Sequence, residues 1–339
     1  MIYQLEPNRV RRTYLGGGRI NAFTGFSPAD DGALRPEDWM ASTVSAFNGA
    51  EEIEGEGLGR VADGRLVKDI IGSMPILVKL LDSDERLVIQ AHPTVSFAKA
   101  RMNSTVGKTE CWYFLPGTAP DACVYLGFKP GITREKWVTA FDRFNNRTID
   151  QSEQSNNELL DWLHRIPVKA GDFVFVDGGV PHAIGAGCFM IELQEPSDLM
   201  VVAERFTPSG RRIPDVKMHS GLGWDGMFDV FEYVGYEFEE LCRKYVRRRE
   251  DLASVHRVVG RDFTDKFEMF VMTEGELSVS GARGVAVVTQ GEGRCNGMSI
   301  RKGDRIVFSG EGPLRLDGGC EIVVCLKMEN QEGTSCAAR

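Results

Sequence analysis

The sequence lacks the features that mark several large classes of protein. Its net charge of −9 gives no positive excess, whereas nucleic-acid binding needs a basic surface that displaces the counterions of the phosphates. No apolar run approaches the roughly 20 residues of a membrane helix, and the N-terminal stretch has no apolar core of a secretory signal. We therefore expect a cytoplasmic protein with neither a nucleic-acid partner nor a membrane partner.

Closely spaced cysteine pairs and nucleotide-binding motifs are also missing. The eight cysteines include no C-x-x-C pair and lie mostly among apolar residues, which is typical of small core residues in a reducing compartment. We expect free thiols. The glycine run at residues 16–18 lacks the lysine of a P-loop, and no G-x-G-x-x-G segment follows a strand, which argues against a nucleotide site.

Glycine, in contrast, is abundant. The chain has 339 residues, of which 38 are glycine, with 42% hydrophobic and 26% charged residues. Its length is enough for about two domains at roughly 150 residues each, and its apolar and charged fractions are those of a soluble globular protein. Many glycines favour tight turns between short strands. The composition therefore predicts an all-β fold with two domains.

An internal repeat supports two domains of one kind. Residues 168–182 and 300–314 match at a constant offset of 132, so that Gly171 corresponds to Gly303 and His182 to Leu314. A weaker echo relates the apolar runs that begin at Glu110 and Glu268. Repetition of this kind indicates a duplicated supersecondary unit. We expect an N-terminal metal-binding domain at 1–230, a C-terminal domain at 231–328 and a polar tail at 329–339.

Two segments have helical rather than strand-like spacing. Val95, Ala98 and Met102 follow one helical face after His92-Pro93. A small helical insertion is predicted at about 132–166, where two apolar patterns are separated by a polar stretch. These patterns consist of Trp137, Phe141 and Phe144, followed by Leu159, Leu163 and Ile166. In this interpretation His164 lies on the exposed face of the second helix.

Two of the five histidines of the chain indicate a metal site. His92 and Gln90 share one face of a strand, because side chains two residues apart point the same way. Glu110 begins the next strand-like run, and His182 ends the first copy of the repeat. Two imidazoles, one carboxylate and one amide oxygen suit zinc or another first-row divalent ion. We therefore predict one divalent metal ion at Gln90, His92, Glu110 and His182.

Six motifs in the same order resemble the type I mannose-6-phosphate isomerases of the cupin superfamily, over about residues 36–217. The motifs are Gln90-Ala-His92-Pro, Gly107-Lys108-Thr-Glu110-Cys-Trp-Tyr, Tyr125-Leu-Gly-Phe-Lys129, Lys169-Ala-Gly-Asp172, Pro181-His182-Ala-Ile-Gly185 and Glu192-Leu-Gln-Glu-Pro-Ser197-Asp198. The resemblance implies two cupin (jelly-roll) β-barrel domains, with zinc on the same four ligands in the first and no metal in the second.

The reaction that the resemblance implies is the interconversion of mannose 6-phosphate and fructose 6-phosphate through a cis-enediol. This reaction needs a base at the C1 or C2 hydrogen and a positive group that stabilises charge on O1 or O2. The resemblance marks Lys108 and Glu192 as the proton-handling residues, and it leaves open which of the two is the base.

The sequence departs from the family pattern where the substrate phosphate would be held. Val88 replaces a usual serine two residues before Gln90, Val202 replaces an arginine and Ser209 replaces a lysine. We predict that Arg205 takes over the catalytic arginine's role and contacts the substrate. Arg211 and Arg212 are predicted to help bind it, with Lys217 following in the same cationic stretch.

Two other functions are compatible with these departures. One is an isomerase or epimerase of another sugar or sugar phosphate, with a rebuilt substrate clamp. The other is a catalytically silent sugar-binding cupin. In either case the expected partner is a small-molecule sugar or sugar phosphate, and the sequence leaves the oligomeric state open.

Overall fold

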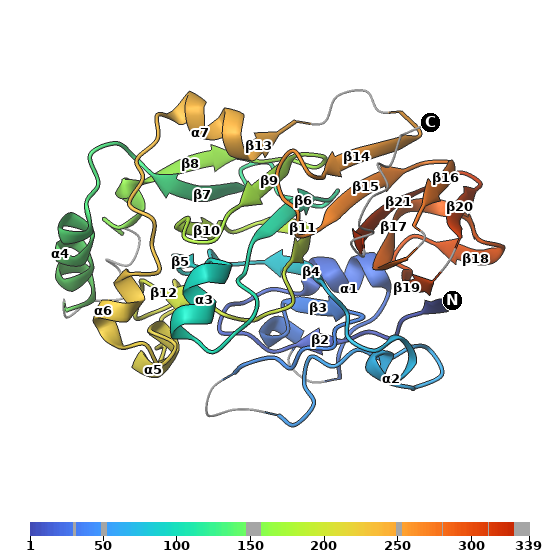
Figure 1. Ribbon diagram of the computed structural model, residues 1–339, viewed down its shortest axis with the longest axis horizontal. Helices are drawn as coiled ribbons and strands as arrows, with labels where there is room; N and C mark the ends of the chain where they lie inside the picture. The colour runs from blue at the N-terminus through green and yellow to red at the C-terminus, as the bar shows by residue number, and fades with distance from the viewer. Residues whose placement is uncertain are drawn as a thin grey trace.

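Strands organised in three sheets dominate the computed structural model, which describes residues 1–29, 32–48, 53–146, 157–248, 253–279, 281–310 and 312–328. Figure 1 shows most strands of the first two sheets, coloured blue to yellow, on one side of the molecule and the orange and red strands of the C-terminal sheet on the other. The all-β, cupin-like prediction is confirmed. No helix in these described ranges is both long and apolar enough to cross a membrane.

Two sheets of the N-terminal part enclose the predicted metal ligands. The seven-stranded sheet runs in the order β13 (Val246–Arg247), β9 (Phe173–Val176), β6 (Glu110–Phe114), β11 (Cys188–Gln194), β4 (Leu77–Ser83), β3 (Glu37–Met40) and β2 (Arg9–Val10). The five-stranded sheet runs in the order β12 (Val201–Val202), β5 (Gln90–Ala91), β10 (His182–Ile184), β7 (Cys123–Phe128) and β8 (Leu163–Pro167).

A nine-stranded sheet forms the C-terminal part. Its main path is β1 (Ile2–Gln4), β19 (Arg305–Gly310), β17 (Ala282–Cys295), β21 (Cys320–Met328), β15 (Glu268–Met272) and β14 (Val255–Val259). The strands off this path are β16 (Gly275–Ser278), β18 (Met298–Arg301) and β20 (Pro313–Asp317). The helical segments are α1 (Gly18–Thr24), η1 (Gly32–Leu34), α2 (Val67–Ile71), α3 (Val95–Arg101), α4 (Arg134–Asn145), η4 (Leu160–Trp162), α5 (Asp215–Met218), α6 (Gly223–Phe228) and α7 (Phe238–Tyr245).

The strand orders of the two parts repeat one pattern. The order β9-β6-β11-β4 matches β19-β17-β21-β15, and the order β5-β10-β7-β8 matches β16-β20-β17-β18. The strand β17 serves both halves of its barrel, since its first part pairs with β19 and β21 and its last part with β18 and β20. Each half is therefore the double-sheet arrangement of a jelly roll.

The turn at the centre of the sequence repeat has the same geometry in both copies. Gly171 and Gly303 have φ of 86° and 89°, in the left-handed region that glycine adopts without steric cost. Asp172 accepts a hydrogen bond from the amide of Lys169 at 3.0 Å, and Asp304 accepts one from Arg301 at 2.9 Å. The repeat at offset 132 is confirmed. The weaker echo is wrong, because β6, which begins at Glu110, matches β17 rather than β15.

The register of the repeat explains why the corresponding positions of the second barrel hold no comparable ligands. Glu110 pairs with Val176 and Gln90 with His182. At the offset of 132, the corresponding pairs are Gly284 with Phe308 and Leu277 with Leu314. A Cβ on Gly284 would lie 2.4 Å from the ring of Phe308, so the aromatic side chain fills the space of the missing carboxylate. These side chains form part of a continuous apolar interior.

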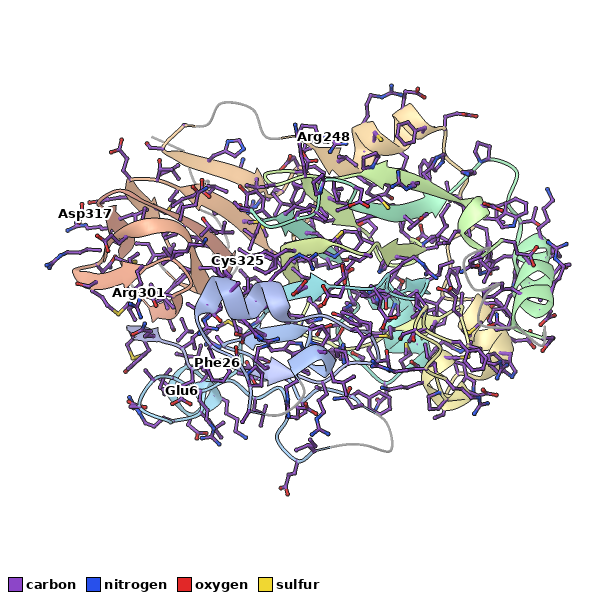
Figure 2. All side chains as sticks on the ribbon, turned by 180° about the vertical axis from the view of Figure 1, so that it is seen from behind. Glu6, Phe26, Arg248, Arg301, Asp317 and Cys325 are labelled. Atoms are coloured by element: carbon purple, nitrogen blue, oxygen red, sulfur yellow. The ribbon has the colours of Figure 1, made fainter. Side chains whose placement is uncertain are left out.

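The two barrels share a core. One buried cluster joins Cys111 and Phe175 of the first barrel with Val287 and Cys325 of the second, and Figure 2 shows Cys325 near the middle of the molecule, with Arg301 and Asp317 toward its outer end. Strand β1 pairs with β19, and β13 pairs with β9. Segments from both sides of the predicted boundary at 230/231 therefore join the sheet of the opposite part, and the division into 1–230 and 231–328 stays a prediction.

The helical insertion is only partly as expected. Helix α4 begins after Thr133, whose hydroxyl accepts a hydrogen bond from the Lys136 amide, and it buries Trp137 and Phe141. The second predicted helix is wrong, because Leu163–Pro167 forms strand β8 beside β7. Proline at position 167 disfavours helical backbone at the residue before it. The intervening polar stretch falls partly on residues 147–156, and the predicted tail is 329–339, both outside the described residues.

The structure also tests two predictions about side chains, the exposure of His164 and the presence of free cysteine thiols. His164 does not lie on an exposed helix face, because it is buried in β8 with its Nε2 2.7 Å from the carbonyl oxygen of Tyr236. Seven of the eight cysteines are free thiols, six of them buried. This agrees with the prediction, and Cys336 lies outside the described residues.

Candidate metal centre and active site

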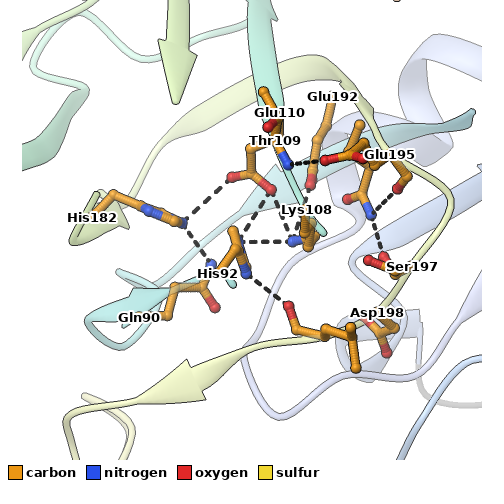
Figure 3. A network of polar contacts seen from close by, with 12 residues as sticks. Gln90, His92, Lys108, Thr109, Glu110, His182, Glu192, Glu195, Ser197 and Asp198 are labelled. Carbon is orange, nitrogen blue, oxygen red and sulfur yellow. Dashed lines mark hydrogen bonds and ion pairs between the residues drawn. The ribbon is translucent and has the colours of Figure 1, made fainter. Parts of the chain in front are cut away.

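The four predicted ligands come from three strands and one loop that meet inside the first barrel. Gln90 on β5 and His182 on β10 are directly paired, His92 follows β5, and Glu110 opens β6 on the facing sheet. The ligand atoms of His92, Glu110 and His182 all lie within 4.8 Å of one another. Figure 3 shows them converging with Gln90 on one point. The structure thus brings together all four residues that the sequence selected.

Both imidazoles are held with Nε2 toward this point. Nδ1 of His92 lies 2.9 Å from the carbonyl oxygen of Leu199, and Nδ1 of His182 lies 2.9 Å from that of Val180. Each Nδ1–H therefore donates to the backbone, so Nε2 is the unprotonated nitrogen of each ring and can coordinate an ion. Burial lowers the pKa of His92 to about 3, so its ring is neutral, as a metal ligand must be.

The carboxylate between the imidazoles is suited to a cation. Glu110 Oε2 lies 3.2 Å from His92 Nε2 and 2.8 Å from Lys108 Nζ, and Oε1 lies 3.4 Å from His182 Nε2. Oε2 nevertheless accepts no hydrogen bond of good geometry. The amide of Gln90, 3.3 Å from His182 Nε2, can present either a nitrogen or an oxygen. Two neutral nitrogens, a carboxylate and an amide oxygen fit zinc and similar divalent ions.

The two predicted proton-handling residues lie beside the ligands. Lys108 Nζ is 2.9 Å from His92 Nε2 and 3.7 Å from Glu192 Oε1. Both side chains are buried, with Lys108 2% and Glu192 3% exposed. Burial raises the pKa of Glu192 to about 7, which places its titration near neutrality, where a general acid or base is most effective. Lys108 and Glu192 can therefore reach the same small volume next to the predicted metal ligands.

Glu192 belongs to a buried network of ion pairs that the sequence analysis did not predict. Lys79 Nζ lies 3.4 Å from Glu192 Oε1 and 3.6 Å from Glu37 Oε2. Burial alone would lower the pKa of Lys79, but these two carboxylates raise it, so Lys79 stays charged. The signal available in the sequence was a lysine inside the apolar strand Leu77–Ser83, since a lysine is almost never fully buried without a partner.

The network continues to the N-terminal segment. Tyr14 and Trp39 donate hydrogen bonds to Glu37 at 2.7 and 2.6 Å. Arg12 contacts Glu37 at 3.1 Å and holds Asp198 with two hydrogen bonds, at 2.9 and 2.5 Å. Arg12 and Asp198 are 186 residues apart in sequence, so their pairing could only be found in the folded chain.

Many of these groups line one cavity. Its charged lining includes Lys79, Lys108, Glu110 and Glu192. The apolar lining includes Leu81, Leu87, Val88, Ile184, Met200, Val202 and Ile213. Val202 pairs directly with Gln90 across the sheet, and paired side chains in antiparallel strands share one face. The departure at position 202 therefore lies immediately beside a predicted metal ligand.

The structure does not place the predicted arginines on this cavity. Among the described residues, Arg205, Arg211 and Arg212 are all missing from its lining. Arg205 donates a hydrogen bond to Asp215 at 2.5 Å and lies over the ring of Trp224, and the exposed Arg212 contacts the same carboxylate at 3.3 Å. Arg211 donates to the carbonyl oxygen of Thr13. Their assignment to substrate binding stays a prediction.

We compared the chain with proteins of known name. No protein-family model matches the chain. It is 28% identical over 263 residues to mannose-6-phosphate isomerase ManA of Bacillus subtilis, a match that covers 74% of each chain. It is 32% identical over 130 residues to mannose-6-phosphate isomerase of Streptococcus mutans, covering 37% of this chain and 34% of that protein. The chain is therefore similar in sequence to mannose-6-phosphate isomerases.

Solved structures of mannose-6-phosphate isomerases have the same fold. The enzyme from Bacillus subtilis superposes with a TM-score of 0.69 at 20% identity, over 96% of this chain and 99% of that one. A mannose 6-phosphate isomerase bound with zinc and yttrium gives a TM-score of 0.68 at 12% identity, over 97% and 100% of the two chains. The similarity to mannose-6-phosphate isomerases therefore extends over both barrels.

Proposed function

We propose that this protein is a metal-dependent aldose–ketose isomerase that interconverts mannose 6-phosphate and fructose 6-phosphate. The observation that carries the proposal is the position of Lys108 and Glu192, which are buried in one cavity beside the convergent ligands His92, Glu110 and His182. A structural metal site would not need two buried proton carriers at its edge. The names of the sequence relatives support the choice of substrate.

The chemistry of isomerisation assigns a task to each group. A proton moves between C1 and C2 of the open-chain sugar, while negative charge develops on O1 or O2 in the cis-enediol. A divalent ion, which we propose to be zinc on Gln90, His92, Glu110 and His182, supplies Lewis-acid stabilisation of that charge. Lys108 and Glu192 exchange the protons, and Lys79 positions the carboxylate of Glu192.

The direct test is a coupled assay of the purified, zinc-loaded protein with mannose 6-phosphate. The same assay includes mannose and a panel of other aldoses and aldose phosphates. We expect strong turnover of mannose 6-phosphate. Turnover confined to a different sugar would replace the substrate in this proposal, and no turnover of any sugar would favour a silent sugar-binding cupin.

An isomerase or epimerase of another sugar is the second candidate. It is favoured by the valines at positions 88 and 202, which give the cavity an apolar wall next to Gln90. Such a wall offers no hydrogen bond to a phosphate. Selective activity on an unphosphorylated aldose would establish this candidate over the first.

The proposal includes a cytoplasmic location and a small-molecule partner. It is supported by the seven free thiols among the described residues, since thiols persist in a reducing compartment. Fractionation of cells that produce the protein at its natural level tests the location.

A further inference from the structure

Phe47 differs in its exposure from the other aromatic residue on the cavity lining. Among the described residues, the two aromatic residues that line the cavity are Tyr14 and Phe47. Tyr14 is buried and donates a hydrogen bond to Glu37, whereas Phe47 is 45% exposed and lies outside the buried apolar clusters. Hydrophobic stabilisation is proportional to the apolar area removed from water. The exposed part of the Phe47 ring therefore contributes nothing to the fold and is accessible to a ligand.

Buried charges fix the backbone of Phe47. Its amide donates a hydrogen bond to Asp198 Oδ2 at 3.1 Å, and Asp198, whose side chain is 6% exposed, accepts two hydrogen bonds from Arg12. Arg12 also contacts Glu37 at 3.1 Å. The loop that carries the ring is thus anchored to the network of ion pairs that includes Glu192. Such an anchor lowers the cost of ordering the loop when a ligand binds.

The residue after Asp198 connects this anchor to the predicted metal centre. The carbonyl oxygen of Leu199 lies 2.9 Å from Nδ1 of His92, and Figure 3 shows Asp198 next to this contact. One short segment therefore fixes both the backbone of Phe47 and the imidazole of a predicted ligand. Because Glu192 and Phe47 line the same cavity, a sugar whose C1–C2 end lies at Glu192 occupies a cavity that also contains the ring.

The carbon skeleton of a sugar complements the face of an aromatic ring. In the chair form of mannose, the axial hydrogens on C3 and C5 point to the same side of the sugar ring. These hydrogens carry a small positive charge, whereas the face of a phenylalanine ring is negative. Their contact removes apolar area of both partners from water. Ligand pockets commonly combine aromatic side chains with a few polar groups that fix the orientation of the ligand.

We propose that Phe47 stacks against the carbon–hydrogen face of the sugar and supplies part of the affinity for the sugar skeleton, whether or not a phosphate is present. This inference rests on the proposed function, because it takes the substrate to be an aldose or an aldose phosphate. It assigns a substrate contact to the loop after β3, whereas the sequence analysis assigned such contacts to Arg205, Arg211 and Arg212.

Isothermal titration calorimetry of the zinc-loaded protein with 1,5-anhydromannitol and its 6-phosphate tests this contact. Both ligands keep the mannose ring but lack the C1 hydroxyl, so they can neither open nor isomerise. Burial of the exposed part of the phenylalanine ring corresponds to about tenfold in affinity, and Phe47→Ala should lose this factor for both ligands. Phe47→Trp keeps a flat aromatic face and should retain the affinity for both.

Two further variants separate stacking from other effects. Phe47→Leu keeps an apolar side chain without a flat ring and should recover only part of the affinity. Phe26→Ala removes a ring that is 40% exposed and does not line the cavity, so this variant should bind both ligands as the wild-type protein does. Because Phe47 lies outside the apolar clusters, Phe47→Ala should also keep the wild-type Tm.

Several results would overturn the inference. They are an unchanged affinity of Phe47→Ala, a loss for the phosphorylated ligand alone, full affinity in Phe47→Leu, a lowered Tm of Phe47→Ala, or no binding of either ligand to the wild-type protein. If binding depends on Phe47 but mannose 6-phosphate is not converted, only the proposed function is refuted. If mannose 6-phosphate is converted while Phe47→Ala binds both ligands as tightly as the wild-type protein, only this inference is refuted.

Discussion

At the scale of single residues, substitution of the buried Lys108 and Glu192 is the most direct test of catalysis. Each lies beside the ligands without being one. We expect Lys108→Met or Glu192→Gln to reduce kcat by roughly a hundredfold or more, the usual contribution of a positioned acid or base. Metal content, measured by atomic emission, should not change. Normal turnover in both variants would refute their assignment as proton carriers.

We propose that metal binding depends on His92 and His182. Because both present Nε2 to the same point, the double variant His92→Ala/His182→Ala should lose stoichiometric metal after dialysis against a weak chelator. His256→Ala, a change on the distant strand β14, serves as the matched control and should keep the metal content of the wild-type protein. Full occupancy in the double variant would show that other residues bind the metal.

At the scale of elements, the second copy of the repeated turn depends on Gly303, which lies close to the backbone of Phe23. A Cβ at Gly303 would meet the carbonyl oxygen of Phe23 at 2.5 Å, whereas one at Gly297, whose φ is also positive, would meet nothing within 4 Å. Both changes to alanine impose about 1–2 kcal/mol of backbone strain, and overpacking adds roughly 1–3 kcal/mol in Gly303→Ala. Thermal unfolding should therefore show a clearly larger loss of Tm for Gly303→Ala, and equal losses would contradict the packing argument.

At the scale of the whole molecule, one buried ion pair links the two barrels. Arg305 at the start of β19 contacts Asp38 of β3, and the side chains are 7% and 1% exposed. Arg305→Met would leave Asp38 buried without its cation, at a cost of about 3–5 kcal/mol. Arg315→Met in the exposed pair with Glu276 should cost at most about 1 kcal/mol. Urea unfolding of the two variants measures the difference, and similar midpoints would refute a stabilising role for the buried pair.

Local sequence patterns predicted some elements of the fold correctly and others wrongly. Short-range patterns sufficed for β6, α3 and α4, because an apolar run and helical spacing are expressed within a few residues. They failed at Leu163–Pro167, where apolar spacing suited a helix but the segment pairs with β7. They also failed to place Arg205, whose direction depends on Asp215 and Trp224 in the folded chain.

The sequence alone determined the all-β class, the duplicated turn and the four candidate metal ligands, because each is expressed in residue types at characteristic spacings. Only the tertiary structure decided that Lys79 lies between Glu37 and Glu192, and that Arg12 reaches Asp198 across the fold. It also decided that Lys217, not Arg205, lines the cavity. These pairings join segments far apart in the chain, and burial makes each charge depend on partners that no local pattern specifies.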